Sequence, residues 1–203
     1  MTPEDVETFQ RCISVGGVAI FPADTVYGLA TEPDSREGVD RLYRLKLRTP
    51  DKPSAVMFFQ MESALAALPE LGPRTRRVVE CLLPGPVTIL VPNPARRFPL
   101  ACGIEPDRLG IRVPALGGEL EPLAAVMWPV LQSSANRAGG ADARRVDEID
   151  PELRAGADLI LDAGELPGTP STVVDFSAWE EGGTFEVIRE GALPQEAVVA
   201  CLQ

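Results

Sequence analysis

Two cations stand two residues apart in the segment Lys46-Leu47-Arg48. On a continuing helix, side chains at this spacing point in different directions, so they can bind one ligand only if the helix ends here. Pro50 predicts such an end, because the residue before a proline is disfavoured in helical conformation. Cations in a last helical turn also complement the helix dipole, and this segment taken alone favours that structural interpretation.

A second polar group, Gln132-Ser133-Ser134-Ala135-Asn136, follows an apolar run and precedes Gly139-Gly140. This pattern predicts a strand that delivers hydroxyl and amide groups to a loop. Such groups can bind phosphate oxygens without a Walker lysine motif, which the sequence lacks. A hydroxyl-capped turn explains the same pattern about equally well.

Other polar residues follow or interrupt apolar runs. The Pro22–Gly28 segment predicts a polar loop at the end of a strand, where open α/β sheets bind ligands. Arg112 lies inside an apolar segment, so it is either a solvent-facing charge on an edge strand or a buried cation that needs an anion. Asp162 and Asp175 follow or end apolar strands, and we expect them to cap turns and not to act as bases.

Composition narrows the function classes. The 203 residues carry a net charge of -11, which argues against a broad nucleic-acid surface but not against a local basic pocket. The absence of histidine excludes Ser-His-Asp catalysis and histidine-based metal sites. Four scattered cysteines predict neither a zinc site nor a disulfide framework. No apolar run is long enough for a membrane span, so we expect a cytoplasmic protein without a membrane partner.

The elements that must position these residues alternate along the chain. A capped helix is expected from Thr2-Pro3, and a second is expected to start at a capping box of Asp34 and Glu37 and to have Val39, Leu42 and Tyr43 as its apolar face. Further helices are expected near 62–68, 74–83, 118–127, 147–155 and 194–202. Strands are expected at 18–21, 55–59, 87–91, 109–113, 130–133, 159–161, 172–176 and 185–188. Interleaved strands and helices predict an α/β protein with a mixed sheet, in one domain over 1–203.

In order along the chain, these segments resemble the YrdC/TsaC family of threonylcarbamoyl-adenylate synthases. The matching segments are FPADTVYGL at 21–29, KLRTPDKP at 46–53, LPGPVTIL at 83–90, LGIRVP at 109–114, SSAN at 133–136, STVVDF at 171–176 and IREGAL at 188–193. The family signature K-x-R…S-x-N is complete as Lys46, Arg48, Ser134 and Asn136. The resemblance spans about residues 10–195 and corresponds to the short, single-domain form.

The resemblance implies a twisted mixed sheet with flanking helices around a deep electropositive cavity. It implies a nucleotidyltransferase that joins L-threonine, bicarbonate and ATP into threonylcarbamoyl-adenylate and pyrophosphate. The product would then serve partner proteins that transfer the threonylcarbamoyl group to tRNA. Direct tRNA binding by this chain is expected to be weak or absent, because of its net charge.

The resemblance also implies roles for individual residues. Lys46, Arg48, Ser134 and Asn136 are expected to be catalytic. ATP is expected to contact Arg48, Lys52, Ser134, Asn136 and Arg189, and threonine to contact Thr25, Arg112, Gln132 and Ser171. No metal site is expected in the protein, and Mg²⁺ would arrive with the triphosphate. Because the reactants other than the amine are anionic, fixed cations in a closed cleft suit this chemistry.

Some positions depart from the family pattern. Met57 stands where some members carry a polar residue that faces threonine, and Arg108 stands where a small hydroxyl residue is common. Cys102 and Ala138 lie in two further altered segments. These departures leave open a paralogue that forms another carbamoyl-adenylate. An RNA-binding module of the same fold is a third hypothesis.

Overall fold

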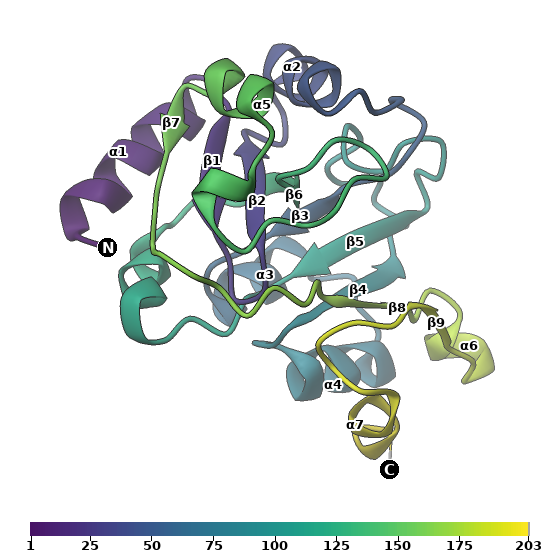
Figure 1. Cartoon of the computed structure of the whole chain (residues 1–203). Coiled ribbons are helices and arrows are strands. Elements are labelled where there is room, and N and C mark those ends of the chain that lie inside the picture. The colour runs from purple at the N-terminus through teal and green to yellow at the C-terminus, as the bar shows by residue number, and fades with distance from the viewer. Residues whose placement is uncertain (203) are drawn as a thin grey trace.

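A mixed β-sheet runs through the computed structural model, which describes residues 1–202 (Figure 1). Its strand order is β7-β1-β2-β6-β3-β5-β4-β8-β9. Parallel pairing joins β7 to β1, β3 to β5 and β4 to β8, and the other neighbours are antiparallel. The mixed α/β class expected from the sequence is therefore confirmed.

The strands fall close to their expected positions, with one exception. Their bounds are β1 Ala19–Pro22, β2 Tyr27–Thr31, β3 Ala55–Met57, β4 Val87–Pro92, β5 Arg108–Arg112, β6 Val130–Ser134, β7 Leu159–Ile160, β8 Thr172–Asp175 and β9 Glu186–Arg189. No strand is expected at β2, because its five residues are all buried and show no alternation of apolar and polar residues. Gly28 weakens the strand pattern there, but it is needed, because a Cβ at this position would approach Phe21 Cε1 to 3.0 Å.

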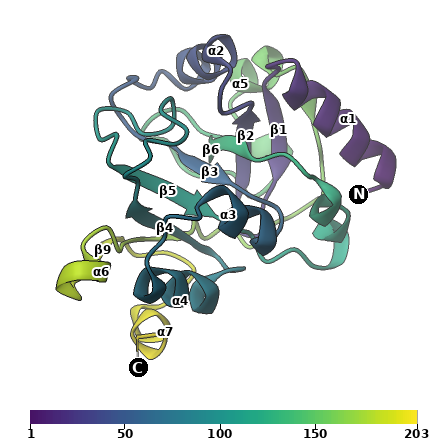
Figure 2. The same cartoon turned by 180° about the vertical axis from the view of Figure 1, so that it is seen from behind.

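The helices flank the sheet. They are α1 Pro3–Ser14, α2 Arg36–Lys46, α3 Met61–Ala67, α4 Pro73–Leu82, η1 Gly118–Ala125, η2 Val146–Glu148, α5 Pro151–Gly156, α6 Trp179–Gly182 and α7 Gln195–Ala200, where η denotes a 3₁₀ helix. Figure 2 shows α1, α3 and α4 in front of the sheet, while Figure 1 shows the long segment after β6 crossing the other side.

Two helix predictions need correction, for reasons that involve proline. The helix expected near 118–127 is the 3₁₀ helix η1, which contains Pro122; proline lacks the N–H that a regular α-helix requires. The helix expected near 147–155 divides into η2 and α5, and Pro151 opens the second piece. The short helix α6 was not predicted.

Helix α2 delivers the first cation pair, and local chemistry fixes both of its ends. Ser35 caps its start by accepting a hydrogen bond from Gly38 N, so the helix begins one residue later than the Asp34–Glu37 capping box predicts. At its other end Leu47 adopts φ 52° and ψ 39°, a left-handed conformation that stops the helix after Lys46. The helix thus ends before Pro50, and Arg48 leaves it in a new direction.

The prediction that the four cysteines form no disulfide framework was wrong. Cys81 on α4 is joined to Cys201 beyond α7, across a sequence separation of 120 residues. Two cysteines this far apart carry no spacing motif, so only the packing of the folded chain could identify the pair. Within residues 1–202, no helix is both long and apolar enough to cross a membrane.

Aromatic rings tie α1 to the sheet. Phe9 of α1 is fully buried, and its ring centroid lies 5.4 Å from that of Phe21 and 6.0 Å from that of Phe59. The apolar positions Val6, Phe9 and Ile13 share one side of the helix and are all buried. The helix therefore anchors to the sheet through one apolar stripe.

We expect Phe9→Ala to lower the free energy of unfolding by about 3–5 kcal/mol, because it leaves a cavity between three rings. Val15→Ala is the matched control, since Val15 follows the same helix with 83% of its surface exposed. It should change stability by less than about 0.5 kcal/mol. Urea denaturation of both variants measures the difference, and equal effects would contradict this account of the core.

Candidate active site

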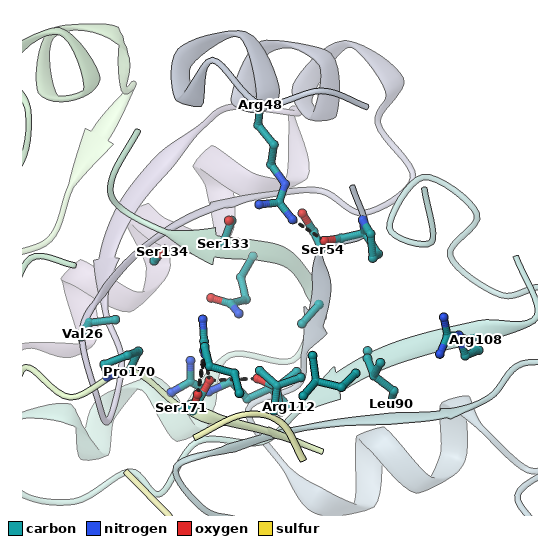
Figure 3. Close-up of a pocket in the computed structure, with 18 of the residues that line it drawn as sticks. Val26, Arg48, Ser54, Leu90, Arg108, Arg112, Ser133, Ser134, Pro170 and Ser171 are labelled. Atoms are coloured by element: carbon teal, nitrogen blue, oxygen red, sulfur yellow. Dashed lines mark hydrogen bonds between the residues drawn. The ribbon is translucent and has the colours of Figure 1, made fainter. Parts of the chain in front are cut away.

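A cavity of about 410 Å³ opens on one side of the sheet. Its floor consists of alternate residues of neighbouring strands, because side chains two apart on a strand share a face. These are Thr88 and Leu90 of β4, Arg108, Gly110 and Arg112 of β5, and Gln132 and Ser134 of β6. In Figure 3, Arg48 reaches in from the end of α2, opposite Ser171 and Arg112, and Arg108 lies farther along β5.

Arg48 and Arg189 line this cavity without a carboxylate partner. In the part of the chain that the structure describes, neither has an acidic group within ion-pair distance. Arg48 donates from Nη2 to Pro53 O at 2.5 Å, and its buried Nε lacks an acceptor. Arg189 donates to Ser171 O at 2.6 Å. Their charges are therefore available to an anionic ligand.

Arg112 is the buried cation that needs an anion. It is 3% exposed on an interior strand, and its Nη2 donates to Asp24 Oδ1 and to Thr25 Oγ1. Ala115 N donates to the other oxygen of Asp24 at 3.0 Å. Burial lowers the pKa of Arg112, and Asp24 opposes this effect. The β1–β2 loop thus holds the guanidinium in a fixed position at the cavity wall.

The signature residues form a chain of hydrogen bonds behind the cavity. Lys46 is 1% exposed, and its Nζ donates to Ser134 O, to Asn136 O at 2.6 Å and to Asn136 Oδ1 at 3.0 Å. Ser134 Oγ donates to Asn136 Oδ1 at 2.8 Å. Asn136 Nδ2 donates to Gly140 O at 2.7 Å. This network fixes the loop after β6 against the end of α2.

Burial changes the acidity of Lys46. Burial, together with the nearby charge of Arg48, lowers the pKa of the ammonium to about 8, while Asp142 acts in the opposite direction. The oxygens of Ser134 and Asn136 accept hydrogen bonds from Lys46 Nζ and hold it in place. Lys46 consequently donates hydrogen bonds to the loop after β6, and its neighbours form the cavity wall.

A second network holds Ser171 and Arg189 together. Ser171 is 4% exposed, and its hydroxyl lies 3.0 Å from that of Thr88. The segment that carries Arg189 packs closely on residues 170–172, and a side chain at Gly191 would collide with this backbone. Thr172 Oγ1 donates to Leu193 O at 2.6 Å and closes the same contact. The start of β8 and the end of β9 thus meet at one wall.

Six of the ten predicted site residues line the cavity: Arg48, Arg112, Gln132, Ser134, Ser171 and Arg189. The other four do not. Lys46 and Asn136 lie behind Ser134, Thr25 is fully buried behind Arg112, and Lys52 is exposed outside the lining. Of the pair Lys46 and Arg48, only Arg48 therefore lines the cavity.

Sequence reasoning missed three charged residues at the site. Asp24 was quoted in a motif without a role, Arg108 only as a departure, and Glu105 not at all. Asp24 could have been found as the anion that a buried Arg112 requires. Asp162 and Asp175 do accept turn hydrogen bonds, from Gly164 N and Ser177 N, as expected.

The chain matches the Sua5/YciO/YrdC family, described as telomere recombination, over residues 11–191. The chain belongs to this family. A threonylcarbamoyl-AMP synthase of Hahella chejuensis is 32% identical over 171 residues, with 82% of this chain and 92% of the relative aligned. A threonylcarbamoyl-AMP synthase of Stenotrophomonas maltophilia is 34% identical over 161 residues, covering 77% of this chain and 84% of the relative.

Solved structures share the fold. Pyrococcus abyssi Sua5, crystallised with L-threonine, superposes with a TM-score of 0.86 at 24% identity and covers the whole of this chain. This chain spans 58% of that protein. Escherichia coli YciO superposes with a TM-score of 0.79 at 22% identity, covering 97% of this chain and 94% of its own. Because both identities are below 25%, the likeness to these two solved structures shows a shared fold only.

We expect the stability of the wild type, relative to Lys46→Met, to rise between pH 8 and 10. The folded chain releases the Lys46 proton near pH 8, whereas the unfolded chain keeps it until about pH 10.5. In this window the unfolded state binds more protons, so the free energy of unfolding increases with pH. Methionine at this position removes the titration.

Urea denaturation at pH 7, 8, 9 and 10 measures this difference. Lys52→Met is the matched control, because it changes the other lysine, which is exposed. Its profile should run parallel to that of the wild type. If the stability profile of Lys46→Met also ran parallel to that of the wild type, Lys46 would keep its ordinary pKa in the folded protein.

Proposed function

We propose that this protein is a threonylcarbamoyl-AMP synthase, which makes L-threonylcarbamoyladenylate and pyrophosphate from L-threonine, bicarbonate and ATP. The observation that carries the proposal is the pair of guanidinium groups, Arg48 and Arg189, that face one cavity without acidic partners. In a chain with a net charge of -11, this local excess of positive charge suits an anionic ligand. The names of the bacterial relatives support the same activity.

The reaction consists of two bond-forming steps. The threonine amine attacks bicarbonate, or CO2 formed from it, and gives a carbamate with loss of water. A carbamate oxygen then attacks the α-phosphorus of ATP, and the bond to the β-phosphate oxygen breaks to release pyrophosphate. Both steps bring anions together, so placement and charge neutralisation supply most of the catalysis.

The cavity offers a separate group for each charged part of the reactants. We assign the phosphates to Arg48, Ser134 and Arg189, which line the cavity. We assign threonine to the wall formed by Arg112, Gln132 and Ser171, where the guanidinium can bind its carboxylate. Thr25 supports this wall by accepting a hydrogen bond from Arg112.

The remaining predicted residues receive indirect roles. Lys46 and Asn136 position Ser134 through their shared hydrogen bonds. Lys52 lies on the exposed loop after Arg48, from which a long side chain could reach the outer phosphates. Within residues 1–202, no cluster of three or more acidic, cysteine or histidine side chains could hold a metal ion. Mg²⁺ therefore fits this site as a companion of the triphosphate, whose charge it would partly neutralise.

We further propose that the product passes to proteins that threonylcarbamoylate tRNA, and that this occurs in the cytoplasm, where ATP and bicarbonate are available. The Cys81–Cys201 pair is unusual for such a compartment, since cytosolic thiols are mostly kept reduced. Both sulfurs lie outside the cavity lining. The proposed chemistry does not require the disulfide.

Replacing either unpaired guanidinium should impair turnover strongly. We expect Arg48→Ala and Arg189→Ala each to lower kcat/KM by about 10²–10³, since each removes a donor that neutralises the reacting phosphates. Arg76→Ala is the matched control, because Arg76 pairs with Glu80 on α4, away from the cavity. Pyrophosphate release with ATP, bicarbonate and L-threonine measures the effect.

The same assay separates the synthase from its alternative. Omitting threonine should abolish pyrophosphate release, and other single amino acids should not restore it. Release that is independent of threonine would instead favour a paralogue with a different acyl acceptor. Met57 bears on this choice: it is fully buried in β3, so it provides no polar contact to an amino acid.

Direct tRNA binding should be weak. We expect no saturable binding at sub-micromolar concentrations when tRNA is titrated at two salt concentrations, because the acidic surface repels phosphates. Acidic side chains pair with several surface arginines, as at Arg137 with Asp150 and Arg144 with Glu148. Tight binding with a steep dependence on salt would support an RNA-binding module instead.

A further inference from the structure

The charged groups of the cavity are neutralised to different degrees from one end to the other. Arg48 and Arg189 have no acidic partner in the described chain, and Arg112 has one, Asp24. Arg108 has two, because its Nη1 donates to Asp175 Oδ2 at 2.6 Å and its Nη2 to Glu105 Oε1. The end of the cavity at Arg108 therefore carries a net negative charge.

This end is well separated from the proposed threonine wall. Arg108 and Arg112 lie four residues apart on the same face of β5, which places their backbones about 13 Å apart at the rise of a strand. Figure 3 shows Arg108 far along the strand from Arg112 and Ser171. Between them the floor is apolar: Gly110 pairs with Leu90, and a Cβ on Gly110 would come within 3.2 Å of Leu90 Cδ2.

Glu105 is the only acidic residue that lines the cavity among residues 1–202. Its side chain is 42% exposed, and one oxygen accepts from Arg108. The other oxygen has no protein donor in the described chain. Asp175, whose side chain is 10% exposed, holds Arg108 and is itself fixed by Ser177 N at 2.7 Å. The buried carboxylate of Asp175 thus fixes Arg108, and Arg108 in turn fixes the partly exposed carboxylate of Glu105.

A free carboxylate in an anion-binding cavity must face a part of the substrates that is not anionic. The phosphates belong near Arg48 and Arg189, and threonine belongs near Arg112. The nucleoside is the remaining part, and its apolar ring suits the floor formed by Leu90 and Gly110. Ribose offers two vicinal hydroxyl donors, for which a carboxylate is a common acceptor in nucleotide sites.

We propose that Glu105 binds the ribose hydroxyls of the nucleotide, and that Arg108 and Asp175 are positioning residues for it. This inference rests on the proposed function for the location of the nucleotide. Arg108 and Asp175 thereby define a subsite at this end of the cavity. It makes the protein selective for ribonucleotides over deoxyribonucleotides.

Binding of ATP and of 2′-deoxy-ATP by isothermal titration calorimetry, without threonine or bicarbonate, tests the proposal. The wild type should bind ATP about tenfold more tightly than 2′-deoxy-ATP, which corresponds to one charge-assisted hydrogen bond. Glu105→Ala should reduce this ratio to about two or less. The ratio is the readout, because removing a negative charge strengthens the binding of both nucleotides.

Asp107→Ala is the matched control, since Asp107 lies on the same loop, is 74% exposed and does not line the cavity. It should keep the wild-type ratio. Arg108→Gln should lower the ratio, and the double variant with Glu105→Ala should lower it no further, as expected for a residue that acts through Glu105. The KM for threonine should be unchanged in Glu105→Ala.

A wild-type ratio that persists in Glu105→Ala would overturn the proposal, as would a wild type that binds both nucleotides equally. The binding of N6-methyl-ATP to the wild type and to Glu105→Ala is measured in parallel. A loss of discrimination against that analogue alone would assign Glu105 to the base and overturn the ribose contact. ATP binding without threonine-dependent turnover would instead contradict the proposed function, and it would leave the nucleotide comparison valid.

Discussion

The site depends on one buried ammonium group. Lys46 ends α2 and donates its hydrogen bonds to the backbone and side chain of the loop that follows β6. This connection joins two elements 88 residues apart in sequence. A buried ammonium requires nearby acceptors, because desolvation without them costs several kcal/mol. The oxygens of Ser134 and Asn136 provide them, and the cavity wall is fixed as a result.

The same connection explains why Arg48 faces the cavity while Lys46 does not. The left-handed conformation of Leu47 turns the chain between them, so that two cations only two residues apart serve different purposes. Lys46 donates its hydrogen bonds to protein oxygens, whereas Arg48 retains donors for a ligand. The K-x-R spacing is thus a geometric requirement of a helix end and does not demand that both cations touch the substrate.

Much of the fold could be predicted from the sequence, because apolar periodicity and proline positions are local signals. The strand β2 was not predicted, because it is buried on both faces and contains Gly28. The 3₁₀ helix η1 was predicted as an α-helix, although Pro122 interrupts the helical pattern there. The site could be predicted only as a set of residue types. Which of them reach the cavity depends on contacts between distant segments, such as Arg112 with Asp24, that no local pattern records.

In the proposed arrangement, the distribution of charge orders the substrates within the cavity. Every guanidinium that lines it is held, but the number of acidic partners rises from none at Arg48 and Arg189 to two at Arg108. Because a cation already paired with carboxylates attracts a further anion only weakly, this difference directs the phosphates to Arg48 and Arg189. It leaves the acidic end to the uncharged nucleoside. The neutralising carboxylates therefore contribute to selectivity as much as the arginines do.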